Sequence, residues 1–390
     1  MKVMLLNDTG IVPHIGCQAV SDAHVRMLAA HGHVVKYRYF VGQLNEFYTG
    51  NPQKSINKVF SNNDLMQKIS DVDAVIVNGE GTIHHGAGLH YLAILAAAQE
   101  LGKKTLIVNA VFQESYGFEP VLRKLDDFCV RDIFSSEFAS KKNISNRVVL
   151  DSFIEAKFDS FKKPFIDLSE KVVVTDWHPD RERNVGYTLR RYLKENKKQC
   201  FYFPLQHGIQ SYLWREAPRT LGACKLIITG RHHGVYLSAI AKKSFIALPS
   251  NTYKVEGLIR MSGLPIPVCS NPKELSSAIK FCQNNKSIYQ EFFSFIDTYR
   301  PLSTFAALGK SNDVVSIRDE LLQLEHQISQ YSMSEMADLW PLASMNDNTS
   351  WFKSLMRKQV DHLRKNQKCR EFYDTLPIGV KIWLKQVRKV

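Results

Sequence analysis

The feature that most constrains the fold is a repeated alternation of short apolar runs with segments of helical periodicity. The clearest run covers residues 73–78, Asp-Ala-Val-Ile-Val-Asn, and is continuous and β-branched, as expected for a strand buried on both faces of a parallel sheet. The same half of the chain contains further predicted strands at 2–7, 34–40, 105–111 and 128–131, and predicted helices at 17–31 and 89–101. This alternation predicts a Rossmann-like α/β domain.

The pattern begins again after Lys162-Lys163-Pro164, where charge and proline mark a crossing point. The second set contains predicted strands at 171–175, 199–204, 225–229 and 244–248, and predicted helices at 183–196 and 235–241. The expected fold class is therefore α/β, with two Rossmann-like domains that face a cleft, as in the GT-B class of glycosyltransferases. The expected divisions are an N-terminal domain (1–162), a C-terminal domain (163–290), a helical segment that crosses back over the first domain (291–350), and a basic aromatic tail (351–390).

Positive charge is concentrated in this tail. The chain has 390 residues and a net charge of +13, and residues 351–390 contribute eleven Lys or Arg against three Asp or Glu. Aromatic side chains such as Trp351 and Trp383 lie among these cations. The composition is typical of a segment that binds an anionic membrane surface, with a solvated helical face as the alternative. Nucleic acid phosphates would suit the same cations, but we expect no nucleic acid partner.

The start of the chain lacks the cationic lead and apolar stretch of a secretion signal, and no apolar run approaches the roughly 18 residues that span a bilayer. Seven scattered cysteines without a C-x-x-C pair indicate reduced thiols. We expect a cytoplasmic protein, attached at most peripherally to the inner face of the cytoplasmic membrane.

Ligands of open α/β domains bind beyond the carboxyl ends of the strands, so the residues that follow each predicted strand are candidate site residues. After the first strand come Asn7, Gly16 and Gln18, in a glycine-containing loop that leads into a helix. The exposed N–H groups of such a helix start favour an anion or a polar group of a substrate. A loop that only turns the chain is the alternative.

The second candidate segment follows the strand at 73–78. Gly79 and Gly81 flank Glu80 and allow a ligand to approach the backbone closely, while His84 and His85 follow a few residues later. Glu80 is a candidate general base towards a sugar hydroxyl. The alternative is that Glu80 pairs with a histidine or lysine and holds the turn. We expect no metal here, because adjacent histidines seldom converge on one ion and no thiolate or spaced carboxylate joins them.

Two further segments carry fixed positive charge. Arg131 follows the strand at 128–131 and is either a bidentate anion ligand or part of an Arg131–Asp132 arrangement that caps the next helix. The strongest segment is Thr229-Gly230-Arg231-His232-His233-Gly234, which supplies a guanidinium, a titratable proton carrier at His233 and a point of close contact at Gly234. Lys254, after the next strand, is the candidate second cation.

The run Gly230–Val235, followed by Ala239-Ile240-Ala241, Phe245–Leu248 and Lys254–Leu258, resembles the signature of the polysaccharide pyruvyl transferases. That signature is an Arg-x-His-Gly turn, a small-residue helix, a strand and a basic loop. Three earlier segments are similar to other turns of the family, and they are Ile15-Gly16-x-x-Ala19, Gly79-Glu80-Gly81 and Arg131-Asp132-x-x-Ser135. The resemblance spans residues 1–285. His232 stands where the family usually has leucine, and Glu80 stands where it usually has glycine.

The resemblance implies transfer of a pyruvyl group from phosphoenolpyruvate to two hydroxyls of a sugar, without a separate cofactor. By the family pattern, Arg231 and Arg131 would bind the carboxylate or phosphate of the donor, and we expect His232, Gly234 and Lys254 to belong to the same donor site, with the second domain on the donor side. His233 would give or take the proton, and the first domain would face a sugar or lipid-linked oligosaccharide acceptor of the cell surface. The role of Glu80 as a base is an inference from this sequence and not from the family.

A glycosyltransferase with a nucleotide-sugar donor is the competing interpretation, with Glu80 as its base and Arg231 with His233 holding the phosphates. His178-Pro179, at the end of the strand at 171–175, gives it some support, because such a dipeptide occurs in some sialyltransferases that use CMP-linked donors. A simple loop turn is the alternative for that dipeptide. A non-catalytic anchoring module would leave the residues of the cleft unexplained.

Overall fold

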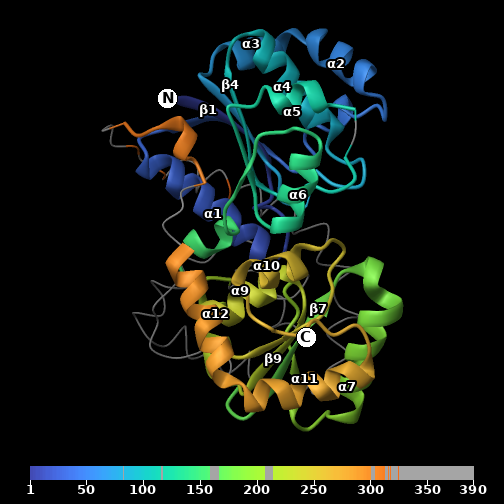
Figure 1. Cartoon of the computed structure of the whole chain (residues 1–390). Coiled ribbons are helices and arrows are strands. Elements are labelled where there is room, and N and C mark those ends of the chain that lie inside the picture. Colours follow the sequence, from blue (N-terminus) through green and yellow to red (C-terminus); the bar gives the residue numbers. More distant parts are fainter. Residues whose placement is uncertain are drawn as a thin grey trace, which may run out of the picture.

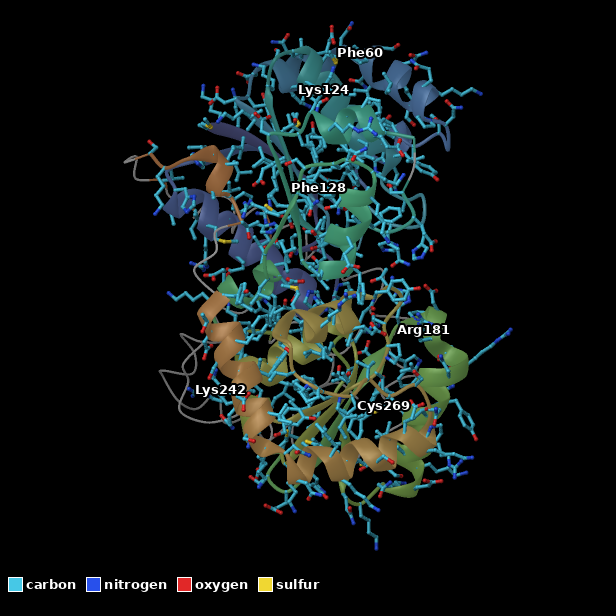
Figure 2. The ribbon with its side chains drawn as sticks, in the orientation of Figure 1. Phe60, Lys124, Phe128, Arg181, Lys242 and Cys269 are labelled. Atoms are coloured by element: carbon cyan, nitrogen blue, oxygen red, sulfur yellow. The ribbon has the colours of Figure 1, made fainter. Side chains whose placement is uncertain are left out.

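The computed structural model of the chain describes residues 1–81, 83–115, 117–158, 167–206, 214–299 and 304–311, with residues 315, 317 and 324. Two parallel sheets, each covered by helices, lie one above the other in Figure 1. The α/β class with two Rossmann-like domains is confirmed. Side chains fill the space on both sides of each sheet, with Phe128 inside the upper half and Cys269 inside the lower half (Figure 2).

The first sheet has six parallel strands in the order β2-β1-β3-β4-β5-β6. Its strands are β1 (Lys2–Asp8), β2 (Val34–Phe40), β3 (Ala74–Asn78), β4 (Lys104–Ala110), β5 (Asp127–Val130) and β6 (Arg147–Val148). Successive side chains of a strand point to opposite faces of the sheet, and each face has its own hydrophobic core. Met4 and Val75 therefore pack on one side of the sheet, and Val3 and Ala74 pack on the other. The strand order reverses between β1 and β3, and ligands of such sheets bind at the carboxyl ends beside this point.

Helices cover both faces of the first sheet. They are α1 (Ile15–Ala30), α2 (Pro52–Phe60), α3 (Asn63–Ser70), α4 (Leu89–Glu100), α5 (Glu119–Arg123) and α6 (Ile133–Lys141), with 3-10 turns at Asn45–Phe47 and Ser152–Glu155. Helix α1 begins at Ile15, two residues before the predicted start, because the ring of His14 caps it and accepts the N–H of Gly16 at 2.9 Å.

The second sheet has four parallel strands in the order β10-β9-β7-β8, and its order reverses between β7 and β9. Its elements are β7 (Val172–Trp177), β8 (Cys200–Tyr202), β9 (Leu226–Gly230), β10 (Phe245–Ala247), α7 (Tyr187–Glu195), α8 (Ala217–Gly222), α9 (His232–Ile240), α10 (Lys254–Ser262), α11 (Pro272–Asn284) and α12 (Lys286–Tyr299). Short turns at Pro179–Arg181 and Glu182–Gly186 precede α7 and replace the start of the helix predicted at 183–196. Helix α9 begins at His232 rather than at the predicted residue 235, so both histidines lie in its first turn.

Helix α1 joins the two halves of the molecule. Its first turns, including Ile15 and Ala19, belong to the core of the second sheet, whereas Leu28 near its end belongs to a core of the first sheet. The N–H of Ile15 donates to the carbonyl of Leu205 at 2.8 Å, which ties the start of the helix to the second half. Figure 1 shows α1 running from the upper sheet down to the junction, where it meets the region of α9 and α10.

After α12 the chain returns to the first sheet. Phe305 and Leu308, in and beside the 3-10 turn Ala306–Leu308, are buried in the same core as Val3 and Leu5. Of the helical segment expected over 291–350, the described residues include the end of α12, this turn and Leu324, which packs against Ile11 and Phe40. The expected tail at 351–390 lies outside the described residues, and the divisions at 162, 290 and 350 stay predictions. None of the described helices combines the length and apolar composition that crossing a membrane requires.

Candidate active site

The carboxyl ends of the two sheets meet at the junction of the two halves. Glu80, two residues after β3, brings its Oε1 atom to 3.4 Å from Nε2 of His233, in the first turn of α9. Each of these residues follows a strand that borders the reversal point of its own sheet. Convergence of these two predicted catalytic residues is therefore a consequence of the doubly wound topology.

A buried aspartate that the sequence analysis missed holds this junction. Asp151, three residues after β6, is fully buried, and its Oδ2 atom lies 3.3 Å from Nε2 of His233 and 3.4 Å from Nε2 of His232. The same oxygen forms an ion pair with the guanidinium of Arg131. Burial raises the pKa of Asp151, but Arg131 and the two histidines outweigh it and hold this pKa well below its usual range. Its place just beyond a strand end was the signal available in the sequence.

Gly16 lets the ring of His233 enter this junction. A Cβ atom on Gly16 would overlap Nδ1 of His233, so only glycine leaves room for the imidazole against the start of α1. The ring of Phe153 lies on another side, with ring centroids 5.4 Å apart. Gly16 was predicted as part of a ligand loop, and in the structure it positions His233 instead.

The carboxylate of Glu80 is engaged on both oxygens. Oε2 accepts a hydrogen bond from Oγ1 of Thr9 at 2.6 Å, and Oε1 accepts one from Sγ of Cys17 at 3.6 Å. Burial, with Glu80 next to it, raises the pKa of the Cys17 thiol well above its usual value. Of the two readings of Glu80, the structure favours the one in which it pairs with a histidine.

The glycines beside Glu80 have separate structural reasons. A Cβ atom on Gly79 would lie 2.5 Å from the Cβ of Ala110, so Gly79 permits close packing of β3 on β4. Gly81 has a φ of +62°, in the left-handed region that glycine adopts without strain. Neither glycine needs a ligand to explain it.

Arg231 is held by the end of the neighbouring strand. Nε and Nη2 lie 2.8 and 2.6 Å from the same oxygen of Asp176, at the end of β7, and Nη2 also donates to Oε1 of Gln206 at 2.7 Å. The other oxygen of Asp176 accepts the N–H of Leu205 at 2.7 Å. The positive charge of Arg231 is therefore largely balanced inside the protein, although 12% of its side chain stays exposed.

Lys254 is the predicted cation whose charge is least balanced. Its Nζ atom donates to Oδ1 of Asn251 at 2.7 Å, and within the described part of the chain no carboxylate lies within ion-pair distance of it. Burial lowers the pKa of Lys254 to about 7, and the guanidinium groups of Arg131 and Arg231 add to this effect. Lys254 also begins α10, where the side chain of the N-cap residue Tyr253 makes no capping hydrogen bond. An anion bound here would meet the ammonium group, in a first helical turn that also contains the carboxylate of Glu256.

Three residues predicted to bind the donor lie in the interior, where they are paired or packed within the protein. Arg131 is 1% exposed and paired with Asp151, while Asp132 caps α6 by accepting the N–H of Ser135 at 2.8 Å, as the structural alternative proposed. His232 is enclosed against Tyr236, and burial lowers its pKa to about 3. A Cβ atom on Gly234 would overlap Oγ1 of Thr229, so Gly234 serves the packing of α9 on β9.

The remaining predicted residues of the first domain lie around this cluster without joining it. The side-chain amide of Asn7 donates a hydrogen bond to the carbonyl of Asn78 at 2.6 Å, and Gln18 is buried in α1. Nδ1 of His84 lies 2.8 Å from Nδ1 of His85, and burial, with Lys254 and His85 nearby, lowers the pKa of His84 to about 4. His85 is half exposed beside Glu114.

Two other observations bear on ligands. Among the described residues, no three His, Cys, Asp or Glu side chains are arranged to hold a metal ion. His178 caps the turn that follows β7 by accepting the N–H of Asp180 at 3.3 Å, which explains the His178-Pro179 pair as a loop feature.

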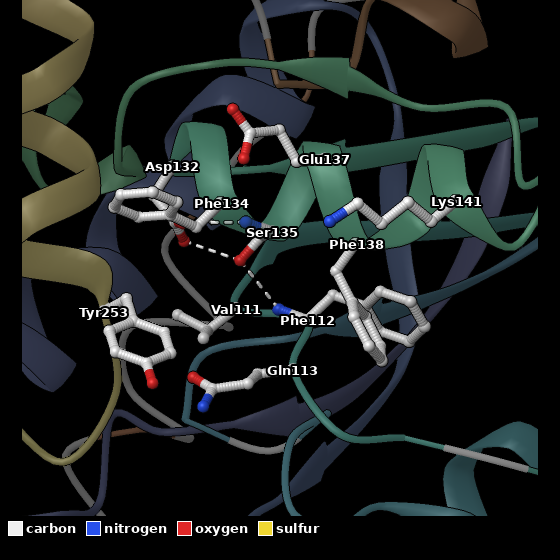
Figure 3. Close-up of a pocket in the computed structure, with 10 residues that line it drawn as sticks. All are labelled: Val111, Phe112, Gln113, Asp132, Phe134, Ser135, Glu137, Phe138, Lys141 and Tyr253. Carbon is white, nitrogen blue, oxygen red and sulfur yellow. Dashed lines mark hydrogen bonds between the residues drawn. The ribbon is translucent and has the colours of Figure 1, made fainter.

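A pocket that the sequence did not reveal opens beside Tyr253, the residue before Lys254. It has a volume of about 170 Å³ and lies between α6 and the residue that precedes α10 (Figure 3). Its lining comprises Val111, Phe112, Gln113, Asp132, Phe134, Ser135, Glu137, Phe138, Lys141 and Tyr253. Both halves of the molecule contribute to it, so no single sequence segment could reveal it.

Comparison with known proteins gives one clear result. Residues 14–252 match the family model of the polysaccharide pyruvyl transferases. No curated protein sequence matches the chain.

Several solved structures are similar to the chain at low identity. The UDP-GlcNAc 2-epimerase of Neisseria meningitidis bound to UDP-GlcNAc is 14% identical, with a TM-score of 0.48 over 75% of this chain and 94% of that one. MnaA of S. aureus with UDP is 15% identical, with a TM-score of 0.48 over 75% and 90%. MurG of Acinetobacter baumannii is 14% identical, with a TM-score of 0.45 over 77% and 99%. Likenesses of this strength carry no conclusion about what the chain binds.

We predict that Asp151→Asn lowers the free energy of unfolding by about 3–5 kcal/mol at pH 7, because it leaves Arg131 buried without a counter-charge. The pKa of Asp151 is lower in the folded state than in the unfolded chain, so its stabilising effect is present above an unfolded value of about 4 and is lost as the pH falls further. Urea unfolding at pH 7 and at lower pH should show the difference between wild type and variant shrinking on acidification. Asp180→Asn, at an exposed carboxylate, is the control, and an equal loss in both variants would refute the role of Asp151.

Proposed function

This chain belongs to the polysaccharide pyruvyl transferase family, and on that premise we propose that it moves the pyruvyl group of phosphoenolpyruvate onto two hydroxyls of a surface-polysaccharide sugar, forming a cyclic ketal. The observation that carries the proposal is the placement of His233 at the domain junction. A proton carrier lies there between two carboxylates, near Lys254, which no carboxylate of the described residues approaches within ion-pair distance.

The donor site that fits this arrangement is built around Lys254. Phosphoenolpyruvate carries a phosphate and a carboxylate, and the ammonium group of Lys254 suits either of them. Arg231 supplies a second, partly exposed guanidinium that Asp176 and Gln206 hold in one orientation. A pre-oriented guanidinium loses little conformational freedom when it binds an anion.

The chemistry assigned to His233 is proton transfer to the enol carbon. Protonation of C3 makes C2 electrophilic, the first sugar hydroxyl adds to C2, and the second hydroxyl then replaces the phosphate at the same carbon. Two C–O bonds and one C–H bond form, while the C–O bond to phosphate and the C=C π bond are lost. One hydroxyl proton restores the proton that His233 gave up, and the other leaves with the phosphate.

We assign Glu80 and Asp151 to positioning His233. Asp151 is fully buried, and both oxygens of Glu80 already have partners within the protein. Each carboxylate lies close enough to Nε2 to fix the orientation of the ring. The alternative in which Glu80 takes the proton of the attacking hydroxyl would require it to release Thr9 or Cys17.

One assay tests both the identity of the donor and the role of His233 as proton carrier. With phosphoenolpyruvate and a panel of methyl glycosides, the wild type should release phosphate, and His233→Gln, which keeps most of the volume of the buried ring, should lower kcat by at least about a hundredfold per folded molecule. His31→Ala, at the end of α1 and remote from the site, is the control. Turnover with a nucleotide sugar and none with phosphoenolpyruvate would establish the glycosyltransferase alternative instead.

Lys254 gives the donor affinity a defined pH dependence. Because the pKa of Lys254 is about 7 without ligand, its ammonium form is depleted as the pH rises from 6 to 8.5, and binding of phosphoenolpyruvate should weaken over this range. Calorimetry in buffers of different ionisation enthalpy should also show proton uptake on binding near pH 8. Lys254→Arg keeps its charge and should lose this dependence. Affinity in the wild type that is constant across the range would contradict the assignment.

We also propose that residues 351–390, which lie outside the described part of the chain, hold the enzyme at an anionic membrane surface near a lipid-linked acceptor. The full chain should sediment with vesicles that contain anionic phospholipid and not with neutral ones. A chain that ends at residue 350 should stay in the supernatant and keep its activity on soluble acceptors. Equal sedimentation of both chains would eliminate the tail as the anchor.

A further inference from the structure

We propose that the pocket between α6 and Tyr253 is the acceptor subsite and that it binds a pyranose ring against the face of Tyr253. This inference rests on the proposed function, because it names the place of the sugar in that reaction. It moves the acceptor away from the glycine loops of the first domain, in which Gly16 and Gly79 serve packing.

Tyr253 has the exposure and support that a sugar platform needs. Its side chain is 55% exposed although it borders the pocket, and the ring of Phe134 meets it edge to face with centroids 5.9 Å apart. Phe134 is held in turn by the guanidinium of Arg260, 5.0 Å from its ring centroid. A fixed aromatic ring with one open face suits the apolar C–H face of a sugar.

Polar groups at the rim of the pocket suit the hydroxyls of a sugar. Figure 3 shows Gln113 beside Tyr253, and Glu137 and Lys141 on the side of α6. The carboxylate of Glu137 lies 3.2 Å from Nη2 of Arg260, and both side chains are substantially exposed. By contrast, Ser135 is satisfied internally, since it donates to Asp132 at 2.6 Å and accepts the N–H of Phe112 at 2.9 Å. Pockets with apolar walls and a few oriented polar groups are typical small-molecule sites.

The pocket adjoins the donor site through the chain itself. Tyr253 directly precedes Lys254, so the proposed sugar platform and the proposed donor cation are neighbours at the start of α10. On the opposite wall, Gln113 pairs with the turn that follows Glu80, because the N–H of His85 donates to its carbonyl at 2.9 Å. Close packing of α10 on α6 at Gly257 and Asp132 fixes the two walls relative to each other.

The test is saturation-transfer NMR on the full-length protein with phosphoenolpyruvate and methyl pyranosides of glucose, galactose, mannose and N-acetylglucosamine. In the wild type, ring protons of at least one glycoside should receive saturation. In Tyr253→Ala, the apparent dissociation constant of that glycoside should rise about tenfold, as expected for loss of one aromatic contact. Tyr253→Phe should bind like the wild type. Tyr187→Ala removes a tyrosine that is 54% exposed on α7 and is the matched control.

The vinyl protons of phosphoenolpyruvate serve as an internal reference in the same samples. If they receive no saturation in the wild type, the proposed function fails, whatever the glycosides show. If phosphoenolpyruvate binds but no glycoside does, or if glycoside binding is unchanged in Tyr253→Ala, the subsite proposal is overturned alone. Equal weakening in Tyr253→Ala and Tyr187→Ala would also overturn it.

Discussion

The buried ion pair between Asp151 and Arg131 fixes the geometry on which the rest of the site depends. Its carboxylate oxygen lies within 3.4 Å of both histidines of α9, and the backbone N–H of Asp151 donates to the hydroxyl of Tyr236 on the same helix at 3.1 Å. A residue at the edge of the first sheet thus orients a helix of the second. Because an uncompensated charge inside a protein is costly, the pair strongly disfavours movement of either partner. The imidazole of His233 is held between the two halves as a result.

The strands and the edge at which the site forms were predictable for a simple reason. Strands buried on both faces of a parallel sheet must be continuously apolar, so the run at 73–78 revealed the position of β3 almost to the residue. Parallel strands also bring their carboxyl ends to one edge, so Glu80 and His233 could be expected to converge although they are far apart in the chain. Both lie next to the reversal point of their sheet, where the topology leaves room for a ligand.

The balance of charges could not be predicted, because it depends on contacts between distant segments. Arg131 and Arg231 look equivalent in the sequence, because each directly follows a strand. Their partners are far away in the chain: Asp151 lies 20 residues from Arg131, and Asp176 lies 55 residues from Arg231. Only the folded chain shows that Arg131 is enclosed and that Lys254 keeps a charge without a carboxylate partner among the described residues. The pocket beside Tyr253 escaped prediction for the same reason, since Tyr253 of the second half closes a hollow lined by residues of the first.

The central claim is that Lys254 and His233 face one bound donor, and a crystal structure of the protein with phosphoenolpyruvate tests it most directly. The account predicts a phosphate or carboxylate oxygen within hydrogen-bond distance of Nζ of Lys254, with the C3 methylene directed towards the imidazole of His233. Phosphoenolpyruvate bound elsewhere, or bound with its methylene turned away from His233, would contradict it.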